Sequence, residues 1–320
     1  MASIGTVREL WRFPVKSMGG ERLDRVDVDA RGVRGDRLWA LRDDERAVIT
    51  SAKKLPVLLQ CGARYLTEPG TDTRPAAIPA VAIDLPDGTT VTSDDADVDA
   101  RLSAVVGRKV SLCRLQPADD ADHYRAAKAS AAEMRADFAL ADDDPLPDFS
   151  MMKLSTLMEL GRFATPRGTY FDAAALHVVT TASLAALRDA APGCDPDPRR
   201  FRANLVIATD GPAGFDEASW TGATLRAGAV TAAIDSPTPR CSMPTRAQRE
   251  LGADPAVLKT IATHAARCLG AYGSVVTPGA LAVGAPVELE RPTRSALGTW
   301  LQARRAGAKR LMLRAAMPKK

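Results

Sequence analysis

The chain has 320 residues, of which 46% are hydrophobic and 26% charged, and its formal net charge is +4. This composition is typical of a globular protein with a substantial core, and the length predicts one large domain or two. Five cysteines without a CxxC motif, together with only three histidines, indicate a reducing compartment and argue against a disulfide framework, a zinc site and a histidine-rich metal site.

The amino-terminal residues contain no cleavage-site pattern, and no run of about 18 apolar residues occurs along the chain. We therefore expect no signal peptide, no membrane-spanning helix and a cytoplasmic location.

Short strands separated by turns dominate residues 3–115. Apolar and charged side chains alternate over residues 23–28, as in a half-buried strand. The segment 81–93 predicts a hairpin, because its residues 86–88 are Pro-Asp-Gly. The apolar spacing within 95–107 predicts the first helix.

Residues 116–150 are rich in Ala and Asp and poor in β-branched residues. They predict a long surface excursion or partial linker with at most one short helix. The domain boundary is expected here.

Short strands return over residues 170–290. One helix is expected with Thr180, Thr181 or Ser183 as its N-cap, and another that opens at Asp254-Pro255. We expect a strand over 200–209. Neither a GxGxxG nor a GxxxxGK[ST] motif is present, so the sequence gives no support for a nicotinamide-binding Rossmann domain or a P-loop.

These patterns predict an α+β protein that consists mainly of antiparallel strands. We expect a β-rich N-terminal domain (1–118), a linker or insertion (119–165), a β-barrel domain with peripheral helices (166–290) and a basic C-terminal tail (291–320).

The tail carries nine Lys and Arg residues and no acidic residue, whereas the rest of the chain has 34 basic and 39 acidic residues. Such a tail either contacts an acidic partner or a membrane surface, or forms a solvated helix that packs through its apolar side. Nucleic acid is not an expected partner, because only 5% of the residues are aromatic and no basic stripe with interleaved aromatics occurs elsewhere.

The segment 236–246, SPTPRCSMPTR, contains the cysteine with the clearest chemical context, Cys241. Arg240 precedes it, and a neighbouring guanidinium favours the thiolate that binds soft metals or attacks electrophiles. The three prolines of the segment predict a rigid loop. The alternative is a buried, inert thiol.

Other polar residues lie at predicted strand ends or turns. Lys16 and Ser17 follow a strand, Arg37 precedes one, and Asp172 precedes an apolar run. Arg202 and Asn204 are expected on one face of the 200–209 strand, where they would suit a planar heterocycle or a phosphate. The alternatives are an exposed turn for Lys16 and Ser17 and an ordinary surface strand for Arg202 and Asn204.

Six blocks in order resemble MOSC-domain proteins (molybdenum-cofactor sulfurase C-terminal domain) that carry an N-terminal MOSC-associated β-barrel domain. The blocks are FPVKSMGGE, GDRLWAL, FDAAALHVVTTASLAAL, RFRANLVI, TPRCSMPT and PGALAVGAPVEL. The resemblance covers residues 4 to about 290 and extends to the mitochondrial amidoxime-reducing components and their bacterial counterparts.

The resemblance implies that Cys241 is both the catalytic residue and the metal ligand, in a molybdenum cofactor (Mo-pyranopterin). It also implies a set of cofactor-binding residues drawn from distant segments: Lys16, Ser17, Arg37, Asp172, Arg202, Asn204, Arg240 and Tyr272.

The function implied is a molybdenum-dependent oxidoreductase that reduces small N-hydroxylated or N-oxide substrates. Its electrons would come from a separate ferredoxin-, flavin- or cytochrome b5-type protein, because the chain has no clustered cysteines for an iron–sulfur domain. Two alternatives are a non-redox carrier of the cofactor or of sulfur, and a barrel that binds another phosphorylated ligand.

The chain departs from this family pattern over 116–169, which is longer than in the reductase relatives. This segment either covers the pocket or only decorates the surface.

Overall fold

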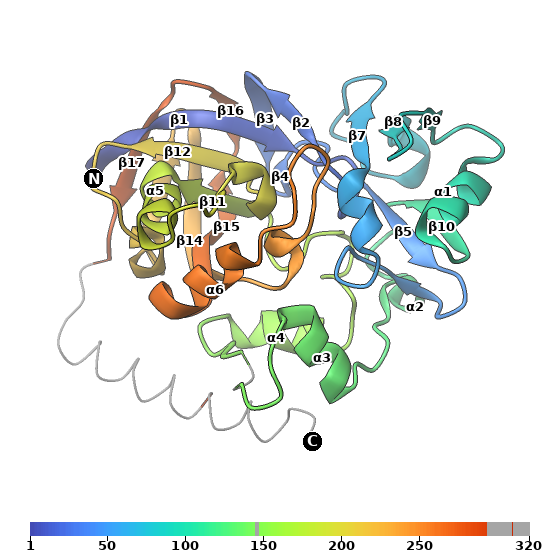
Figure 1. Ribbon diagram of the computed structural model, residues 1–320. Helices are drawn as coiled ribbons and strands as arrows, with labels where there is room; N and C mark the ends of the chain where they lie inside the picture. Colours follow the sequence, from blue (N-terminus) through green and yellow to red (C-terminus); the bar gives the residue numbers. More distant parts are fainter. Residues whose placement is uncertain (145–146, 293–308, 310–320) are drawn as a thin grey trace.

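The computed structural model describes residues 1–144, 147–292 and 309. Within these residues the centre of the fold is a closed barrel of seven strands (Figure 1). The last strand in the hydrogen-bonded order pairs with the first, and this pairing closes the barrel. The order is β12 (Leu205–Thr209), β11 (Leu176–Thr180), β15 (Cys268–Thr277), β14 (Val230–Pro239), β13 (Thr224–Ala227), β17 (Pro286–Glu290) and β1 (Ala2–Arg12).

All barrel pairings are antiparallel except β11 with β12. Apolar side chains from alternate strand positions fill the interior, among them Leu10, Ile207 and Val287. Strand β1 comes from the start of the chain, so the first residues complete the same barrel as residues 176–290. The short strand β2 (Glu21–Leu23) extends the sheet from β1.

Two three-stranded sheets and a separate core form the rest of the N-terminal half. The first sheet contains β10 (Val110–Arg114), β5 (Trp39–Asp43) and β6 (Val48–Ile49), and the second contains β7 (Gly62–Tyr65), β8 (Val81–Asp84) and β9 (Thr90–Thr92). The expected hairpin is confirmed as β8–β9, with a positive φ of 83° at Gly88 in its turn. Strands β3 (Arg25–Asp29), β4 (Gly32–Val33) and β16 (Gly279–Ala282) form a third sheet, which joins the two halves of the chain.

The helices lie outside the sheets. Outside the segment 119–165 they are α1 (Val98–Val106), α5 (Thr181–Ala190) and α6 (Pro255–His264). The 3-10 turns are η1 (Pro56–Gln60), η2 (Pro75–Ala77), η3 (Pro198–Phe201), η4 (Asp216–Ser219) and η5 (Met243–Thr245). The predicted capping signals are confirmed: Thr180 accepts from the Ser183 N–H and Asp254 from the Ala256 N–H. The α+β class with mainly antiparallel strands is likewise confirmed.

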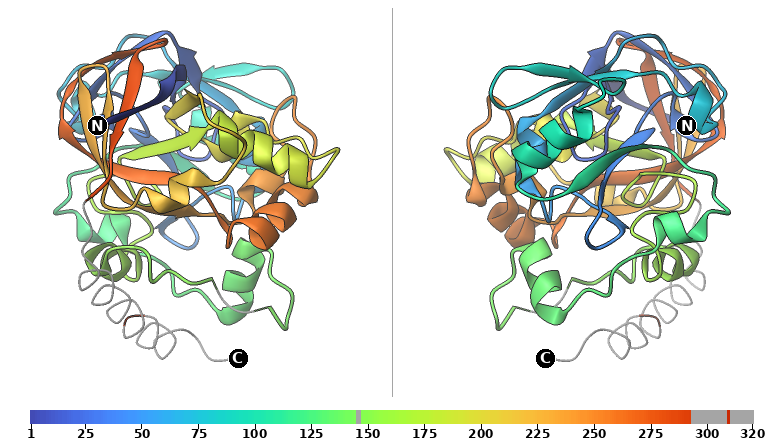
Figure 2. Two further views of the ribbon diagram at one scale, coloured as in Figure 1. Left: turned by 90° about the vertical axis from the view of Figure 1, so that its left-hand side faces the viewer. Right: turned by 90° about the vertical axis from the view of Figure 1, so that its right-hand side faces the viewer.

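The segment 119–165 contains α2 (Ala121–Tyr124), α3 (Ala131–Phe138) and α4 (Leu154–Leu160). Both views of Figure 2 show α3 and α4 beneath the two β-rich halves. The expectation of at most one short helix in 116–150 is wrong, since α2 and α3 both lie there. A capping box at Ser130 and Glu133 starts α3.

Two local predictions about strands are also wrong. The strand expected over 200–209 begins only at Leu205, because η3 precedes it and Arg202 has a positive φ of 54°. Pro237 and Pro239 were expected in a rigid loop but lie within β14, where register shifts against β15 accommodate them. The basic tail 291–320 lies outside the described residues, apart from Arg291, Pro292 and Lys309.

Candidate functional site

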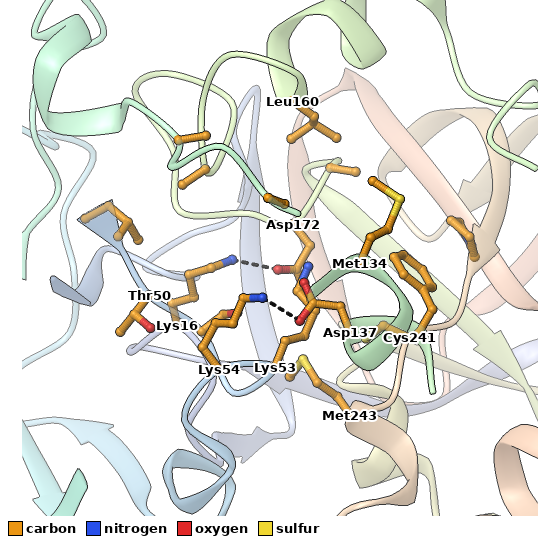
Figure 3. Close-up of a pocket in the computed structure, with 18 of the residues that line it drawn as sticks. Lys16, Thr50, Lys53, Lys54, Met134, Asp137, Leu160, Asp172, Cys241 and Met243 are labelled. Atoms are coloured by element: carbon orange, nitrogen blue, oxygen red, sulfur yellow. Dashed lines mark hydrogen bonds and ion pairs between the residues drawn. The ribbon is translucent and has the colours of Figure 1, made fainter. Parts of the chain in front are cut away.

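A cavity of about 510 Å³ lies between the N-terminal sheets, the barrel and the segment 119–165 (Figure 3). Its volume falls within the usual range of roughly 300–1,000 Å³ for ligand sites. Seven of the nine predicted site residues line it, although they come from widely separated parts of the chain. They are Lys16, Arg37, Asp172, Arg202, Arg240, Cys241 and Tyr272.

Cys241 follows the end of β14 and precedes η5, so two fixed elements hold its main chain. Burial raises the pKa of the Cys241 thiol. This effect is larger than the opposing effects of Lys53, the Met243 N–H and Arg240, which lower the pKa. Arg240 thus acts in the predicted direction, towards the thiolate, but burial has the larger effect. A soft metal ion at the sulfur would displace the proton, because a coordinating thiol is deprotonated outright.

Arg240 does not face a carboxylate. Its Nε donates to the Leu269 carbonyl oxygen at 2.9 Å and its Nη1 to the Phe201 carbonyl oxygen at 3.3 Å. Its Nη2 lies 2.6 Å from His177 Nε2, and the guanidinium carbon lies 5.1 Å from the centre of the Phe201 ring. Main-chain acceptors thus fix this guanidinium while its positive charge stays without an anionic partner.

Lys16 and Asp172 form an ion pair, with 2.6 Å between Nζ and Oδ1. Lys16 lies in the connection between β1 and β2, where its N–H donates to the carbonyl oxygen of Trp39 at the start of β5. Burial opposes ionisation of the Asp172 carboxyl, but the charges of Lys16 and Arg37 hold its pKa well below its usual range. The Asp172 side chain is 49% exposed while that of Lys16 is 5% exposed, so a buried lysine holds in place a carboxylate that faces the cavity.

Arg37 and Arg202 lie on the ring of Phe13, with guanidinium carbons 5.1 and 4.3 Å from its centre. Arg37 pairs with the buried Asp36. Arg202 donates through Nη1 to the Met18 carbonyl oxygen, but its buried Nη2 has no hydrogen-bond partner. Burial, and the neighbouring charge of Arg37, lower the pKa of Arg202 to about 9. An unpaired buried N–H is costly, so this group calls for an acceptor from a ligand.

We call Lys16, Arg37, Arg202 and Arg240 the cationic floor. All four are 7% exposed or less. Two carboxylates, Asp36 and Asp172, are the anions paired with this group. The floor therefore has an excess of positive charge, which favours an anionic ligand such as a phosphate ester.

Ser17 and Asn204 do not line the cavity. The Ser17 Oγ accepts from the Ala52 N–H at 2.9 Å and so holds the loop that carries Lys53. Asn204 links three barrel strands, since its Oδ1 accepts from the His177 N–H and its Nδ2 donates to the Trp11 carbonyl oxygen. The expectation that Asn204 and Arg202 share a strand face is wrong, because the left-handed backbone at Arg202 ends that regularity.

Sequence reasoning missed His177, Lys53 and Arg200, which also line the cavity. His177 lies between Arg240 and the Tyr272 ring, whose centre is 5.4 Å from its own. Burial and Arg240 hold the pKa of His177 well below its usual range, so the imidazole is neutral and its Nε2 accepts from Arg240. The one signal for it was a histidine inside the otherwise apolar run of strand β11 before Thr180.

Among the residues that the structure describes, no group of three or more His, Cys, Asp or Glu side chains could hold a metal ion. The cavity offers a single cysteine sulfur beside a cationic floor, so its residues fit a metal that arrives with other ligands on an anionic carrier.

The described part of the chain also has no helix with the length and apolar character needed to cross a membrane.

Comparison with known proteins gives two family matches. Residues 165–288 match the MOSC domain, and residues 4–114 match the MOSC N-terminal beta barrel domain. No curated protein matches the chain.

Among solved structures, the chain is similar to the YUAD protein from Bacillus subtilis, with 12% identity, a TM-score of 0.42 and coverage of 90% of this chain and 97% of that one. YiiM from Geobacillus stearothermophilus has 17% identity, a TM-score of 0.30 and coverage of 42% and 64%. YiiM from Escherichia coli has 18% identity, a TM-score of 0.30 and coverage of 46% and 65%.

Proposed function

Since the chain belongs to the MOSC-domain proteins that carry an N-terminal MOSC beta barrel domain, we propose that it binds a molybdenum cofactor at Cys241 and reduces N-oxygenated small molecules. MOSC domains are associated with binding of the molybdenum cofactor. The reaction and its electron donor are our proposal.

The observation that carries the proposal is the buried Arg202 Nη2, which has no partner, on a floor with excess positive charge. A phosphate-bearing pterin would supply acceptors to Arg202 and compensate the charge of the floor. Lys16 and Arg37 would contact the same anionic group, and Tyr272 would present its ring and hydroxyl to the cavity. Cys241 would hold the metal.

When bound, the cofactor supplies two-electron oxygen-atom chemistry. In the overall reaction a substrate R–NHOH takes up two electrons and two protons, its N–O bond breaks, and R–NH2 and water form. The electrons come from a separate redox protein of the ferredoxin, flavin or cytochrome b5 type.

The residues of the chain bind and orient the reactants. Asp172 stays ionised and faces the cavity, so it offers an acceptor to an N–H or O–H group of the substrate, while Lys16 fixes its carboxylate. His177 stays neutral and holds Arg240 through Nε2. Residues of the segment 119–165, such as Met134 and Phe163, line one side of the cavity.

Two measurements test the proposal. The protein is produced in a host that makes the cofactor, its molybdenum and pterin contents are determined, and reduction of an amidoxime or hydroxylamine is then assayed with an artificial electron donor. Full loading with turnover is expected. Full loading without turnover would favour a cofactor or sulfur carrier, and absence of molybdenum would favour a barrel for another phosphorylated ligand.

A further inference from the structure

The wall of the cavity opposite the cationic floor is apolar. Six side chains from α3, from α4 and from the segment between these helices form it, and we call them the apolar roof: Met134, Phe138, Phe149, Met152, Leu157 and Leu160. In Figure 3 Leu160 lies at the top of the view, and Lys16, Lys53 and Lys54 lie below it. The cavity therefore has one charged and one apolar side.

The apolar roof presents no unpaired charge. Of the cavity-lining residues within 126–164, only Glu133 and Asp137 are charged. Lys54 Nζ lies 3.0 Å from Asp137 Oδ1 and 3.7 Å from Glu133 Oε1, and Arg46 Nη1 lies 3.3 Å from the same Glu133 atom. Both carboxylates are thus neutralised by cations of the N-terminal half.

The roof is fixed to both halves of the protein. On the barrel side the Ser242 N–H, next to Cys241, donates to the Asp137 carbonyl oxygen at 2.9 Å. Arg267 donates to the Phe138 carbonyl oxygen at 3.2 Å, and Lys153 pairs with Asp235 at 2.6 Å. The end of α3 therefore abuts the loop that carries the predicted metal ligand, and the roof is a wall of the same site.

We propose that the apolar roof is the specificity-determining surface for the substrate, and that it selects N-oxygenated compounds whose body is uncharged and apolar, such as an aryl group. This inference rests on the proposed function. An aryl body buries its faces against methionine, leucine and phenylalanine side chains. A charged body would lose its hydration against the roof without gaining a partner.

The selection acts on the body of the substrate, away from the N–O group that reacts. A short alkyl body leaves the roof largely uncontacted and gains little from it. The chain should therefore prefer an aryl amidoxime to acetamidoxime, and this preference should depend on roof side chains.

Helix α4 offers a matched pair of positions for the test. Leu157 lines the cavity, whereas Met158, the next residue, is 56% exposed and does not line it. We compare the holoenzyme with its Leu157→Ala, Met158→Ala and Met134→Ser variants, the last of which changes the roof on α3. For each we measure kcat/KM for an aryl amidoxime and for acetamidoxime.

Leu157→Ala and Met134→Ser should each lower the aryl kcat/KM about tenfold and leave the acetamidoxime value within about twofold, because loss of apolar contact reduces discrimination by roughly this factor. Met158→Ala should change neither value. Equal losses on both substrates, no loss on either, or a shift of the aryl preference in Met158→Ala would overturn the proposal.

A binding measurement separates this proposal from the proposed function. Calorimetric titration with a neutral arylcarboxamide and with acetamide needs no turnover. Preferential aryl binding that weakens in Leu157→Ala supports the roof even if no reduction is found. Turnover without any preference between the two carboxamides overturns the roof and leaves the reductase in place.

Discussion

The cationic floor and the apolar roof enclose the same cavity but are built in different ways. Floor residues are almost fully buried and are held by main-chain carbonyl oxygens and aromatic rings, as for Arg240 and Arg202. Helices α3 and α4 have no fully buried residue and are attached largely through ion pairs and single hydrogen bonds. The floor is therefore part of the folded core, whereas the roof can change with little effect on the fold.

The comparison has a chemical meaning. A rigid floor with buried cations suits a ligand that is always the same, such as a cofactor. A wall of flexible apolar side chains suits the variable part of the site, which faces the substrate. Substitutions in the floor should therefore change cofactor binding, and substitutions in the roof should change substrate preference.

The largest effect is expected at the boundary of the two surfaces. Cys241→Ala should remove turnover and reduce the bound molybdenum, because it removes the single cavity-lining cysteine. The free energy of unfolding of the apo protein should change by only about 1 kcal/mol. Molybdenum analysis, amidoxime reduction and urea unfolding measure the three quantities.

Cys113→Ala is the control for the thiol, since Cys113 is a partly buried cysteine that does not line the cavity. It should keep both metal and activity. Normal turnover in Cys241→Ala would rule out the metal-ligand role of this sulfur.

The second effect distinguishes a ligand-binding arginine from a structural one. Arg202→Met should weaken cofactor binding by about 10- to 100-fold, the equivalent of a charge-assisted hydrogen bond of roughly 1.5–3 kcal/mol. The apo protein should be no less stable, because the substitution removes a buried cation whose Nη2 has no partner.

Arg12→Met is the control variant, because it removes a buried arginine whose role is structural. Arg12 is also buried, but it pairs with Glu21 at 2.7 Å and Glu68 at 2.6 Å and does not line the cavity. This substitution should lower the free energy of unfolding by about 1–3 kcal/mol and leave cofactor affinity unchanged. The same response in both variants would contradict a specific role for the floor.

Much of the floor could be anticipated from the sequence because the family resemblance covers its residues, whereas the local patterns alone left an ordinary surface turn or strand open. Lys16 and Arg37 lie near strand ends, and Arg240 and Cys241 directly follow the end of β14. The sequence did not reveal the backbone conformation at Arg202 or the depth of burial at Cys241. The left-handed backbone at Arg202 could not be inferred from a non-glycine residue, and the burial that raises the pKa of Cys241 comes from distant segments.

The roof could not be predicted for a different reason. Its apolar residues face a cavity rather than a helix-packing core, and α3 lacks the strong amphipathic pattern that identifies a buried helix face. An Ala- and Asp-rich composition then resembles a linker. The positions of Glu133 and Asp137 acquire meaning only when Lys54, far away in sequence, is placed beside them.

A third effect concerns stability against pH. The pKa of His177 is held well below its usual range in the folded protein, so below pH of about 6.5 the unfolded state binds a proton that the folded state does not. This residue therefore makes stability fall as pH drops from about 6.5 towards the folded pKa, by up to about 1.4 kcal/mol per pH unit. Above this window His177 contributes no change of stability with pH.

His177→Gln should flatten the decline, as measured by urea unfolding between pH 7 and 5. Arg240, Arg37 and Asp172 influence this imidazole and stay in the variant. His264→Gln, at an exposed position on α6, is the control and should keep the wild-type slope. Equal slopes in wild type and His177→Gln would refute the assignment.

The smallest effect concerns the attachment of the roof to the N-terminal half. Lys54→Gln and Asp137→Asn should each lower the free energy of unfolding by less than about 1 kcal/mol, because this pair is partly exposed to solvent. We expect a two- to threefold rise in KM for the aryl substrate, on the order of the same free energy, since α3 would lie less firmly over the cavity. Cofactor affinity should stay constant because the floor is intact.

A double-mutant cycle isolates this interaction, and its coupling energy should fall as salt rises, as expected for a screened ion pair. The pair of Arg64 and Asp84, 2.9 Å apart and outside the cavity, is the control, and breaking it should leave KM unchanged. If breaking the Lys54–Asp137 pair weakened cofactor binding rather than aryl recognition, the roof would be part of the cofactor site, and the division between a fixed floor and an adjustable roof would be wrong.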